Sequence, residues 1–180
     1  MIDILNELTN ELNNLKWSKI NGKKRTVLNI AEGGQKEPDR YSFTTGLIRD
    51  WLPCAHNNYT RSLRLSSSSK LKKHQMLMCL ASMYIKEYYP DFKYTSIQFS
   101  NCMLTPRHVD KHNVGESVIV AFGDYTSGGG LIIYDEDGHE HVHDIFHKPL
   151  VFNACQQYHR TQDFVGTRYS ITWFTIKGLS

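Results

Sequence analysis

Residues 117–145 read SVIVAFGDYTSGGGLIIYDEDGHEHVHDI, and this stretch decides the fold class. Three short runs, at 117–123, 130–135 and 139–145, are rich in β-branched and aromatic residues, and turn residues separate them. The segment YDEDGHE joins the second run to the third and supplies Gly138, which can adopt the positive φ of a tight hairpin. No helical period interrupts the stretch. The pattern therefore predicts antiparallel strands connected by turns.

The same pattern of short strand-like runs continues on both sides of this stretch. The flanking strand-like runs are YTSIQFS (94–100), PLVFNA (149–154) and RYSITWFTI (168–176). Half a dozen short strands after Pro90 predict a β-sandwich or jelly roll. Upstream, the expected elements are two further strands and a polar loop, RTVLNIAEGG (25–34), YSFTTGLI (41–48) and GGQKEPDR (33–40).

Two amphipathic helices are expected in the first half of the chain. The first covers residues 1–15, with an apolar stripe at Met1, Leu5, Leu8, Leu12 and Leu15. The second covers residues 70–88, where a loop of four serines precedes it, Ser69 is the expected N-cap and Pro90 ends it. Its apolar residues are Leu71, Leu77, Leu80, Ala81, Tyr84 and Tyr88, and Met76, Met78 and Met83 are expected to fill the core.

These elements predict a mainly β protein with supporting helices (α+β). We expect a single domain over residues 1–180, with residues 1–90 as a helical and strand support region and residues 91–177 as a jelly-roll core. The 40% hydrophobic content suits a folded chain. No run is long enough to cross a bilayer and the first residues do not resemble a signal peptide, so we expect an intracellular protein, cytoplasmic or nuclear. The scattered cysteines, Cys54, Cys79, Cys102 and Cys155, are expected to be reduced thiols.

Charge is unevenly distributed along the chain. Residues 1–90 carry 14 Lys and Arg against 8 Asp and Glu, a balance of +6, and residues 91–180 carry 7 against 10, a balance of −3. Two segments, Lys16–Arg25 and Arg61–Lys73, contain basic residues and no acidic ones. Such segments can follow the phosphates of a nucleic acid, or they can be ordinary solvated surface.

Three residues have the pattern of a metal site. His108 and Asp110, in TPRHVDKHN, lie two apart just after a predicted strand, so their side chains can point to the same face. His159 follows about 50 residues later. Two histidines and one carboxylate form the facial triad that holds Fe(II) and leaves three coordination positions open. An H-x-D motif alone is weak, and the residues beyond His159 strengthen it.

Arg168 and Ser170 lie nine and eleven residues after His159, on a predicted strand. Period two places both side chains on one face of that strand. A guanidinium beside a hydroxyl can hold a planar carboxylate. The alternative is an arginine whose aliphatic stem packs on the sheet while its head lies in water.

These motifs, in this order, resemble those of the iron- and 2-oxoglutarate-dependent dioxygenase superfamily. The resemblance covers about residues 90–177 and implies a double-stranded β-helix (jelly-roll) fold. It implies that the triad binds Fe(II), and that Arg168 and Ser170 bind the distal carboxylate of 2-oxoglutarate. Dioxygen is the further co-substrate. The resemblance implies that the three triad residues and Arg168 are catalytic and that Ser170 only binds 2-oxoglutarate. AFGDYTSGGGLIIYDEDG and GTRYSITWF are most similar to the TET and J-binding-protein group, which oxidises the methyl group of 5-methylcytosine or thymine.

Other residues are secondary candidates. Gln98 and Ser100 precede the triad on a strand, and Gln98 is a candidate for the 2-oxoglutarate carboxylate near iron. Asn113 is a further candidate for the cofactor-binding site, where it can support Asp110 or contact a substrate, or it simply lies in a turn. Tyr125 is either a stacking residue or an ordinary hairpin aromatic. His112 is a rival metal ligand, and an alternating histidine set could bind zinc, although an exposed hairpin strand is favoured: His139, His141, His143 and His147.

Three function classes follow. The first is an oxygenase that oxidises a base in DNA or RNA, with Lys70–Lys73 and the 16–25 cluster gripping phosphates and Tyr125 or Tyr59 stacking on a base. The second is a hydroxylase of peptidyl proline or of a small metabolite on the same scaffold. The third is a non-enzymatic jelly-roll binding module, which leaves His159 and Arg168 unexplained.

Overall fold

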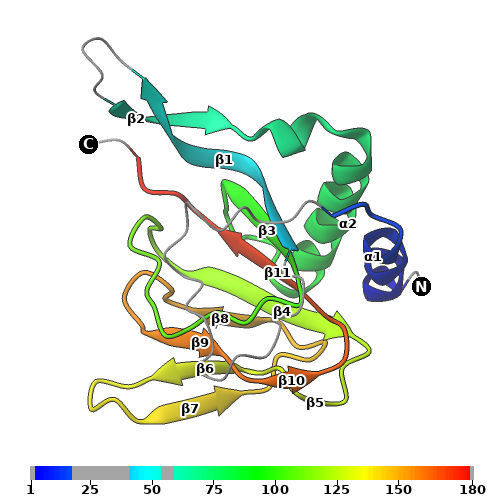
Figure 1. Ribbon diagram of the computed structural model, residues 1–180, viewed down its shortest axis with the longest axis vertical. Coiled ribbons are helices and arrows are strands. Elements are labelled where there is room, and N and C mark those ends of the chain that lie inside the picture. Colours follow the sequence, from blue (N-terminus) through cyan, green and yellow to red (C-terminus); the bar gives the residue numbers. More distant parts are fainter. Residues whose placement is uncertain (1–2, 18–40, 54–58, 179–180) are drawn as a thin grey trace, which may run out of the picture.

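The computed structural model describes residues 3–17, 41–53 and 59–178, which form a mainly β structure with two α-helices (Figure 1). The helical elements are α1 (Ile4–Asn13), the short 3-10 helix η2 (Ser67–Lys70) and α2 (Lys72–Tyr88). The strands are β1 (Tyr41–Pro53), β2 (Tyr59–Leu65), β3 (Ser96–Asn101), β4 (Ser117–Gly123), β5 (Ser127–Gly128), β6 (Leu131–Tyr134), β7 (Glu140–His143), β8 (Leu150–Phe152), β9 (His159–Thr161), β10 (Phe164–Val165) and β11 (Arg168–Phe174).

The strands form one large and two small antiparallel sheets. The main sheet has the order β2-β1-β3-β11-β4-β8, the second has the order β7-β6-β9, and β10 pairs with β5. An isolated antiparallel bridge between His108 and His159 attaches the chain before β4 to the outer side of β9. The last strand, β11, is therefore central in the main sheet, between β3 and β4.

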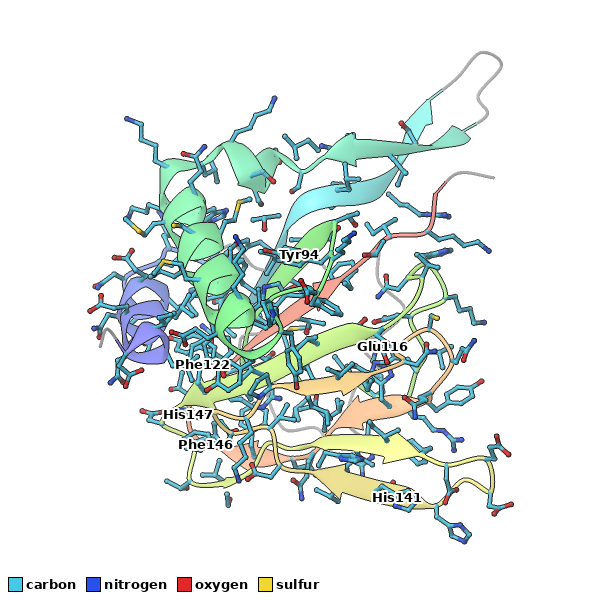
Figure 2. The ribbon with its side chains drawn as sticks, turned by 180° about the vertical axis from the view of Figure 1, so that it is seen from behind. Tyr94, Glu116, Phe122, His141, Phe146 and His147 are labelled. Carbon is cyan, nitrogen blue, oxygen red and sulfur yellow. The ribbon has the colours of Figure 1, made fainter. Side chains whose placement is uncertain are left out.

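One face of the main sheet packs on the helices. Alternate residues of neighbouring strands, such as Phe99, Val120, Ile171 and Trp173, point to this face and are fully buried. The apolar stripe of α1, with α2 beside it, covers them, and the ring of Tyr84 stacks on Trp173 with 6.0 Å between centroids (Figure 1). This face holds the larger hydrophobic core. Phe122 is one of its buried residues, and the partly buried Tyr94 packs against it (Figure 2).

The opposite face of the main sheet packs on the second sheet. Ile119 and Ala121 of β4 join residues of β6 and β8 in a smaller core that includes Ile133, Ile145 and Phe152. The same face is polar on β3 and β11, where Ser100 and Ser170 lie directly opposite each other and are buried. The interior between the two sheets is thus apolar at one side and polar at the other.

The helices differ from the sequence prediction in three details. Ser69 does not cap α2, because its hydroxyl accepts a hydrogen bond from Gly46 N. Ser66 caps the short helix η2 by accepting from Ser68 N, and the N-cap residue of α2, Leu71, makes no side-chain hydrogen bond there. Met76 and Met83 are 52% and 44% exposed, so the prediction that they fill the core is wrong. The reason is that α2 buries a single stripe against the sheet, and these two residues lie outside it. Tyr88, expected on the apolar stripe, is also exposed.

Most predicted strands are confirmed, with shifts of one or two residues at their ends. Gly138 adopts a φ of 86°, as expected for the hairpin between β6 and β7. The short strands β5, β9 and β10 and the strand β2 were not predicted. The expected strand at 25–34 and loop at 33–40 lie outside the described residues, as do Met1 and Cys54. Neither helix in the described part of the chain combines the length and the apolar character that crossing a bilayer requires.

Candidate metal and carboxylate site

The two histidines of the predicted triad are joined through their backbones. His108 N donates to His159 O at 3.0 Å, and His159 N donates to His108 O at 2.9 Å. A threonine pair continues the contact, because the hydroxyls of Thr105 and Thr161 are 2.8 Å apart. This bridge brings imidazoles 51 positions apart in sequence (159 − 108) to a centroid distance of 4.3 Å.

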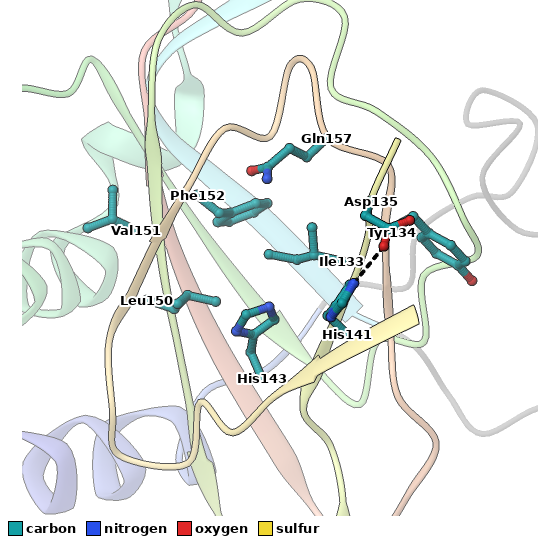
Figure 3. Close-up of a pocket in the computed structure, with 9 residues that line it drawn as sticks. All are labelled: Ile133, Tyr134, Asp135, His141, His143, Leu150, Val151, Phe152 and Gln157. Atoms are coloured by element: carbon teal, nitrogen blue, oxygen red, sulfur yellow. Dashed lines mark hydrogen bonds and ion pairs between the residues drawn. The ribbon is translucent and has the colours of Figure 1, made fainter. Parts of the chain in front are cut away.

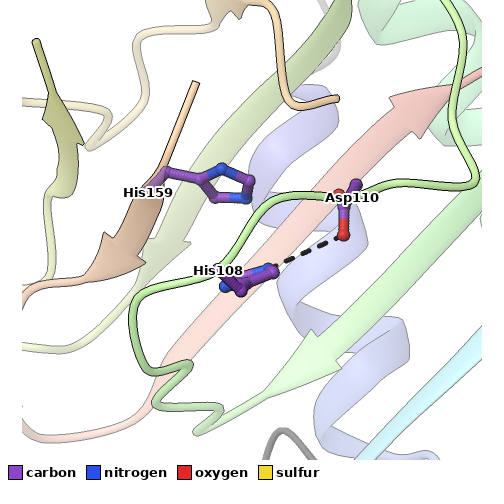
Figure 4. Close-up of side chains that lie close together, drawn as sticks. All are labelled: His108, Asp110 and His159. Carbon is purple, nitrogen blue, oxygen red and sulfur yellow. Dashed lines mark ion pairs between the residues drawn. The ribbon is translucent and has the colours of Figure 1, made fainter. Parts of the chain in front are cut away.

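Asp110 completes the group. Its backbone N donates to Ala154 O at 2.8 Å, which holds the 108–110 segment beside the loop that leads to β9. Asp110 Oδ1 is then 3.6 Å from His108 Nε2 (Figure 4). One ligand atom from each of His108, Asp110 and His159 lies within 4.8 Å of the others, and no other group of three in the described chain does so.

Backbone carbonyls fix the tautomer of both histidines. His108 Nδ1 is 2.7 Å from Pro106 O, and His159 Nδ1 is 2.9 Å from Gln157 O. Because a carbonyl oxygen can only accept, each Nδ1 must carry the proton, and each Nε2 keeps its lone pair for a metal. Burial lowers the pKa of His159, which favours the neutral imidazole that metal binding needs.

The donor set and its exposure fit a divalent transition metal. Two imidazole nitrogens and one carboxylate on one side leave the opposite side of an ion free, as in facial-triad iron sites. His159 is buried, whereas the side chain of Asp110 is 38% exposed, so the site is reachable from solvent on the Asp110 side. Asn113 Nδ2 donates to Asp110 Oδ2 at 3.3 Å, which leaves Oδ1 to face the histidines.

Arg168 lies deep between the sheets. It is 2% exposed, its Nε donates to Gly129 O at 2.8 Å, and its guanidinium lies 5.6 Å from the Phe164 ring centroid. Burial lowers its pKa to about 10, partly offset by a hydrogen bond with Tyr125. No carboxylate among the described residues forms an ion pair with Arg168. The expected alternative, an arginine with its head in water, is therefore wrong.

The predicted partners of Arg168 share its face of the sheet. Ser170 is two residues along β11 and pairs with Ser100 of β3, so period two aligns the three side chains on the inner face. Gln98, on the same face of β3, donates from Nε2 to Ser100 Oγ at 3.3 Å. The structure therefore brings the hydroxyls and the amide into one polar row beside the arginine.

Two contributors to this site were not predicted. The carbonyl of Gly129 orients Arg168, and a side chain at Gly129 would collide with the Tyr125 ring, because a Cβ there would lie 2.5 Å from it. The GGG run at 128–130 was the available signal, and the sequence analysis assigned it no contact with Arg168. Tyr125 is partly buried: its ring packs edge-on against Phe146, 5.0 Å between centroids, and it contacts Arg168.

The other histidine-rich segment is an exposed hairpin, as favoured from the sequence. His139 and His141 have side chains 76% and 56% exposed and both approach Asp135 Oδ2, at 3.4 and 2.9 Å. Hydrogen bonding, first from His141, lowers the pKa of Asp135 to about 2. His112 is exposed and does not belong to the group of three.

A cavity of about 300 Å³ opens between β7 and β8 (Figure 3). Its lining includes His141, His143, Leu150, Phe152 and Gln157. The Phe152 ring lies edge-on to His159 at 5.0 Å, and the Gln157 carbonyl is the partner of His159 Nδ1. The cavity therefore adjoins the side of His159 that faces away from the other two members of the triad.

Comparison with known proteins supports a fold relationship. No protein-family model matches the sequence, and no curated protein matches it. An oxidoreductase of the 2OG-Fe(II) oxygenase family from Burkholderia pseudomallei matches with a TM-score of 0.53 and 12% identity, over 94% of this chain and 77% of that one. NgTET1 in complex with 5mC DNA matches with a TM-score of 0.50 and 13% identity, over 76% of this chain and 61% of that one. The resemblance found in the sequence is confirmed at the level of the fold.

Proposed function

We propose that this chain, which has the fold of the 2OG-Fe(II) oxygenases, is an Fe(II)- and 2-oxoglutarate-dependent dioxygenase that hydroxylates a C–H bond. The overall reaction converts R–H, dioxygen and 2-oxoglutarate into R–OH, succinate and carbon dioxide. The observation that carries the proposal is Arg168, a buried guanidinium without a carboxylate partner in the described chain, in the same inter-sheet interior as the histidine–aspartate group. Burying such a charge reduces the stability of the fold unless an anion pairs with it.

We also propose that the core is a double-stranded β-helix formed by residues 91–177, with residues 1–90 as support within a single domain. The strand order supports this reading. The chain passes repeatedly between the main sheet, which contains β3-β11-β4-β8, and the second sheet, which contains β7-β6-β9 and the bridge at His108. Only the hairpin β6–β7 keeps two consecutive segments in the second sheet. Two facing antiparallel sheets connected in this way are expected of a jelly roll. Strands β1 and β2 then extend the main sheet beyond the core.

His108, Asp110 and His159 would hold the iron. Both Nε2 atoms carry free lone pairs, Asn113 positions Asp110, and burial keeps His159 neutral. When bound, ferrous iron supplies open coordination positions for the keto acid and dioxygen and the oxidising chemistry of the reaction. The chain's own task is to orient the ligands and to limit the access of water.

Arg168 and Ser170 would hold the far carboxylate of 2-oxoglutarate. The guanidinium is already oriented by Gly129 O and Tyr125, so little entropy is lost when the anion binds. Ser170 can donate its hydroxyl proton to the same carboxylate. Gln98 remains a candidate to bind the 2-oxoglutarate carboxylate that lies nearer the metal, because its amide is on the same sheet face as Ser170.

As substrate we propose the methyl group of 5-methylcytosine or thymine in nucleic acid. Two facts support this choice over a peptidyl proline or a small metabolite. Residues 1–90 carry a balance of +6, and one fold neighbour, NgTET1, was solved with 5mC DNA. A base in a duplex must be extruded to reach a site between two sheets. Lys72 and Lys73, however, lie on α2, across the main sheet from the triad, so they do not border the proposed active site.

The test is succinate release from 2-oxoglutarate by protein loaded with Fe(II) without oxygen and then exposed to air. Turnover that is stimulated by oligonucleotides containing 5-methylcytosine or thymine and lost in Arg168→Ala is expected. Unstimulated turnover would retain the oxygenase and redirect the substrate to peptides or metabolites. No succinate from protein shown to contain iron would refute the enzyme and favour a binding module, which should keep its ligand in His108→Ala.

A further inference from the structure

An arginine is held between two tyrosine rings beside the proposed metal site. The guanidinium carbon of Arg107 lies 4.2 Å from the centroid of the Tyr134 ring and 4.8 Å from that of the Tyr158 ring. Arg107 immediately precedes His108, and Tyr158 immediately precedes His159. The stack is therefore built from the immediate chain neighbours of two members of the triad.

The stack lies on the outer face of the second sheet. In β6, Ile133 points inward and pairs with His159, so Tyr134 points outward. Tyr134 N donates to Tyr158 O at 2.9 Å, which keeps the two tyrosines side by side. The stack therefore lies on the outer face of this sheet, and the ring of His159 lies on its inner face.

A charged network fixes the inner ring of the stack. The Tyr134 hydroxyl donates to Glu140 Oε1 at 2.7 Å and accepts from Arg160 Nε at 2.9 Å. Arg160 also forms an ion pair with Glu140, at 3.0 Å between its terminal nitrogen and Oε2. Glu140 is thus paired chiefly with Arg160, and Arg107 adds a weaker electrostatic attraction to the same carboxylate.

The hydrogen-bonding edge of Arg107 is available for a ligand. Its side chain is exposed, and none of the described residues accepts a hydrogen bond from it. Stacking restricts the orientation of the guanidinium plane. Two parallel N–H groups of a guanidinium held in this way can donate to two oxygens of one phosphate. Tyr158 is 48% exposed, so part of its ring is open to a further planar group.

We infer that Arg107, held between Tyr134 and Tyr158, binds a backbone phosphate of a polynucleotide strand whose adjacent nucleotide enters the metal site. This inference rests on the proposed function. A polynucleotide fits better than an acidic peptide, because it offers a phosphate at every residue together with a base that can stack on the exposed part of Tyr158. The lysines of α2 lie on the far side of the sheet, whereas Arg107 is the chain neighbour of His108.

The test measures binding of a fluorescent single-stranded oligonucleotide containing 5-methylcytosine, by anisotropy over a range of salt concentrations. Arg107→Gln is expected to weaken binding about 10-fold and to reduce the slope of log Kd against log salt by about one. Arg107→Lys keeps the charge and loses the fork, so it should preserve the slope and weaken binding by a smaller factor. The control Lys86→Gln removes an exposed cation in the last turn of α2 and should leave the affinity unchanged.

The outcomes separate this inference from the proposed function. Wild-type protein that releases succinate, with equal oligonucleotide affinity in Arg107→Gln, overturns the phosphate site and leaves the oxygenase standing. Protein that releases no succinate but shows the expected loss in Arg107→Gln overturns the oxygenase and keeps the phosphate site. Equal competition by an oligoglutamate of matched charge overturns the choice of a polynucleotide. Thermal unfolding of both Arg107 variants verifies that they are folded.

Discussion

Replacing Arg168 with methionine should remove 2-oxoglutarate binding without destabilising the ligand-free protein. Burial lowers the pKa of this guanidinium from 12.5 to about 10. At about 1.4 kcal/mol per tenfold change, that corresponds to a cost of about 3 kcal/mol for keeping the charge buried. The sign follows from linkage. Because the unfolded chain holds this proton more tightly, the cost is complete at neutral pH and is relieved only as the pH rises through about 10.

The methionine variant also loses favourable contacts. The methionine side chain has no N–H group, so the hydrogen bond to Gly129 O is lost. A hydrogen bond from a charged donor contributes about 2 kcal/mol to stability. The net expectation is a free energy of unfolding that is unchanged or higher by about 1 kcal/mol, which is a rise of about 2–4 °C in Tm for a chain of this size. An arginine that served only as part of an internal ion pair would instead cost about 3–5 kcal/mol when removed.

Thermal unfolding by circular dichroism, under nitrogen and with Fe(II), checks both halves of this prediction. At 100 times its Kd, 2-oxoglutarate should stabilise the wild type by about 2.7 kcal/mol and Arg168→Met not at all. Arg160→Met is the matched control, because Arg160 pairs with Glu140 on the outer face and should leave the ligand effect intact. A variant that unfolds well below the wild type, yet is still stabilised by 2-oxoglutarate, would refute the reasoning.

Three further outcomes are expected. Asn113→Ala removes the hydrogen bond to Asp110 and should weaken Co(II) or Fe(II) binding about 10- to 100-fold in calorimetric titrations, with little change in Tm. Trp173→Ala empties the centre of the helix-facing core, and urea unfolding should show a loss of about 3–5 kcal/mol. Burial lowers the pKa of His159, so its imidazole should titrate below 6.5 in NMR spectra of the metal-free protein, and its contribution to stability, full above that pH, should be lost as the pH falls through the lowered pKa. A normal or raised pKa would contradict the burial argument.

The sequence predicted those parts of the fold in which a strand is long enough to be recognised from its residue types. The strand 117–123 was predicted at its observed bounds, because both of its faces are buried and its β-branched and aromatic residues form a continuous run. The two- and three-residue strands β5, β9 and β10 were missed, because so few residues cannot show a period. The exposed Met76 and Met83 were misassigned, because residue type alone does not reveal which stripe of a helix is covered.

The site was predicted unevenly for a similar reason. His108, Asp110 and His159 were recognisable from residue type and order, and the structure brings them together. The carbonyls that select the tautomers, from Pro106 and Gln157, carry no signal in the sequence, because every residue has a carbonyl. The stacking of Arg107 depends on a register between β6 and the residue before β9, and register is a property of the assembled sheet.

The reciprocal hydrogen bonds between His108 and His159 have a consequence for hydrogen exchange. Each amide proton is protected by the carbonyl of the other residue, so a single opening event exposes both. The two amides should therefore exchange at a common opening free energy, although 51 positions (159 − 108) separate them. His108 and His159 would both hold the metal, so its binding would favour the closed bridge and should slow both amides by the same factor. The exchange of one backbone pair would thus report metal affinity directly, without substrate and without turnover.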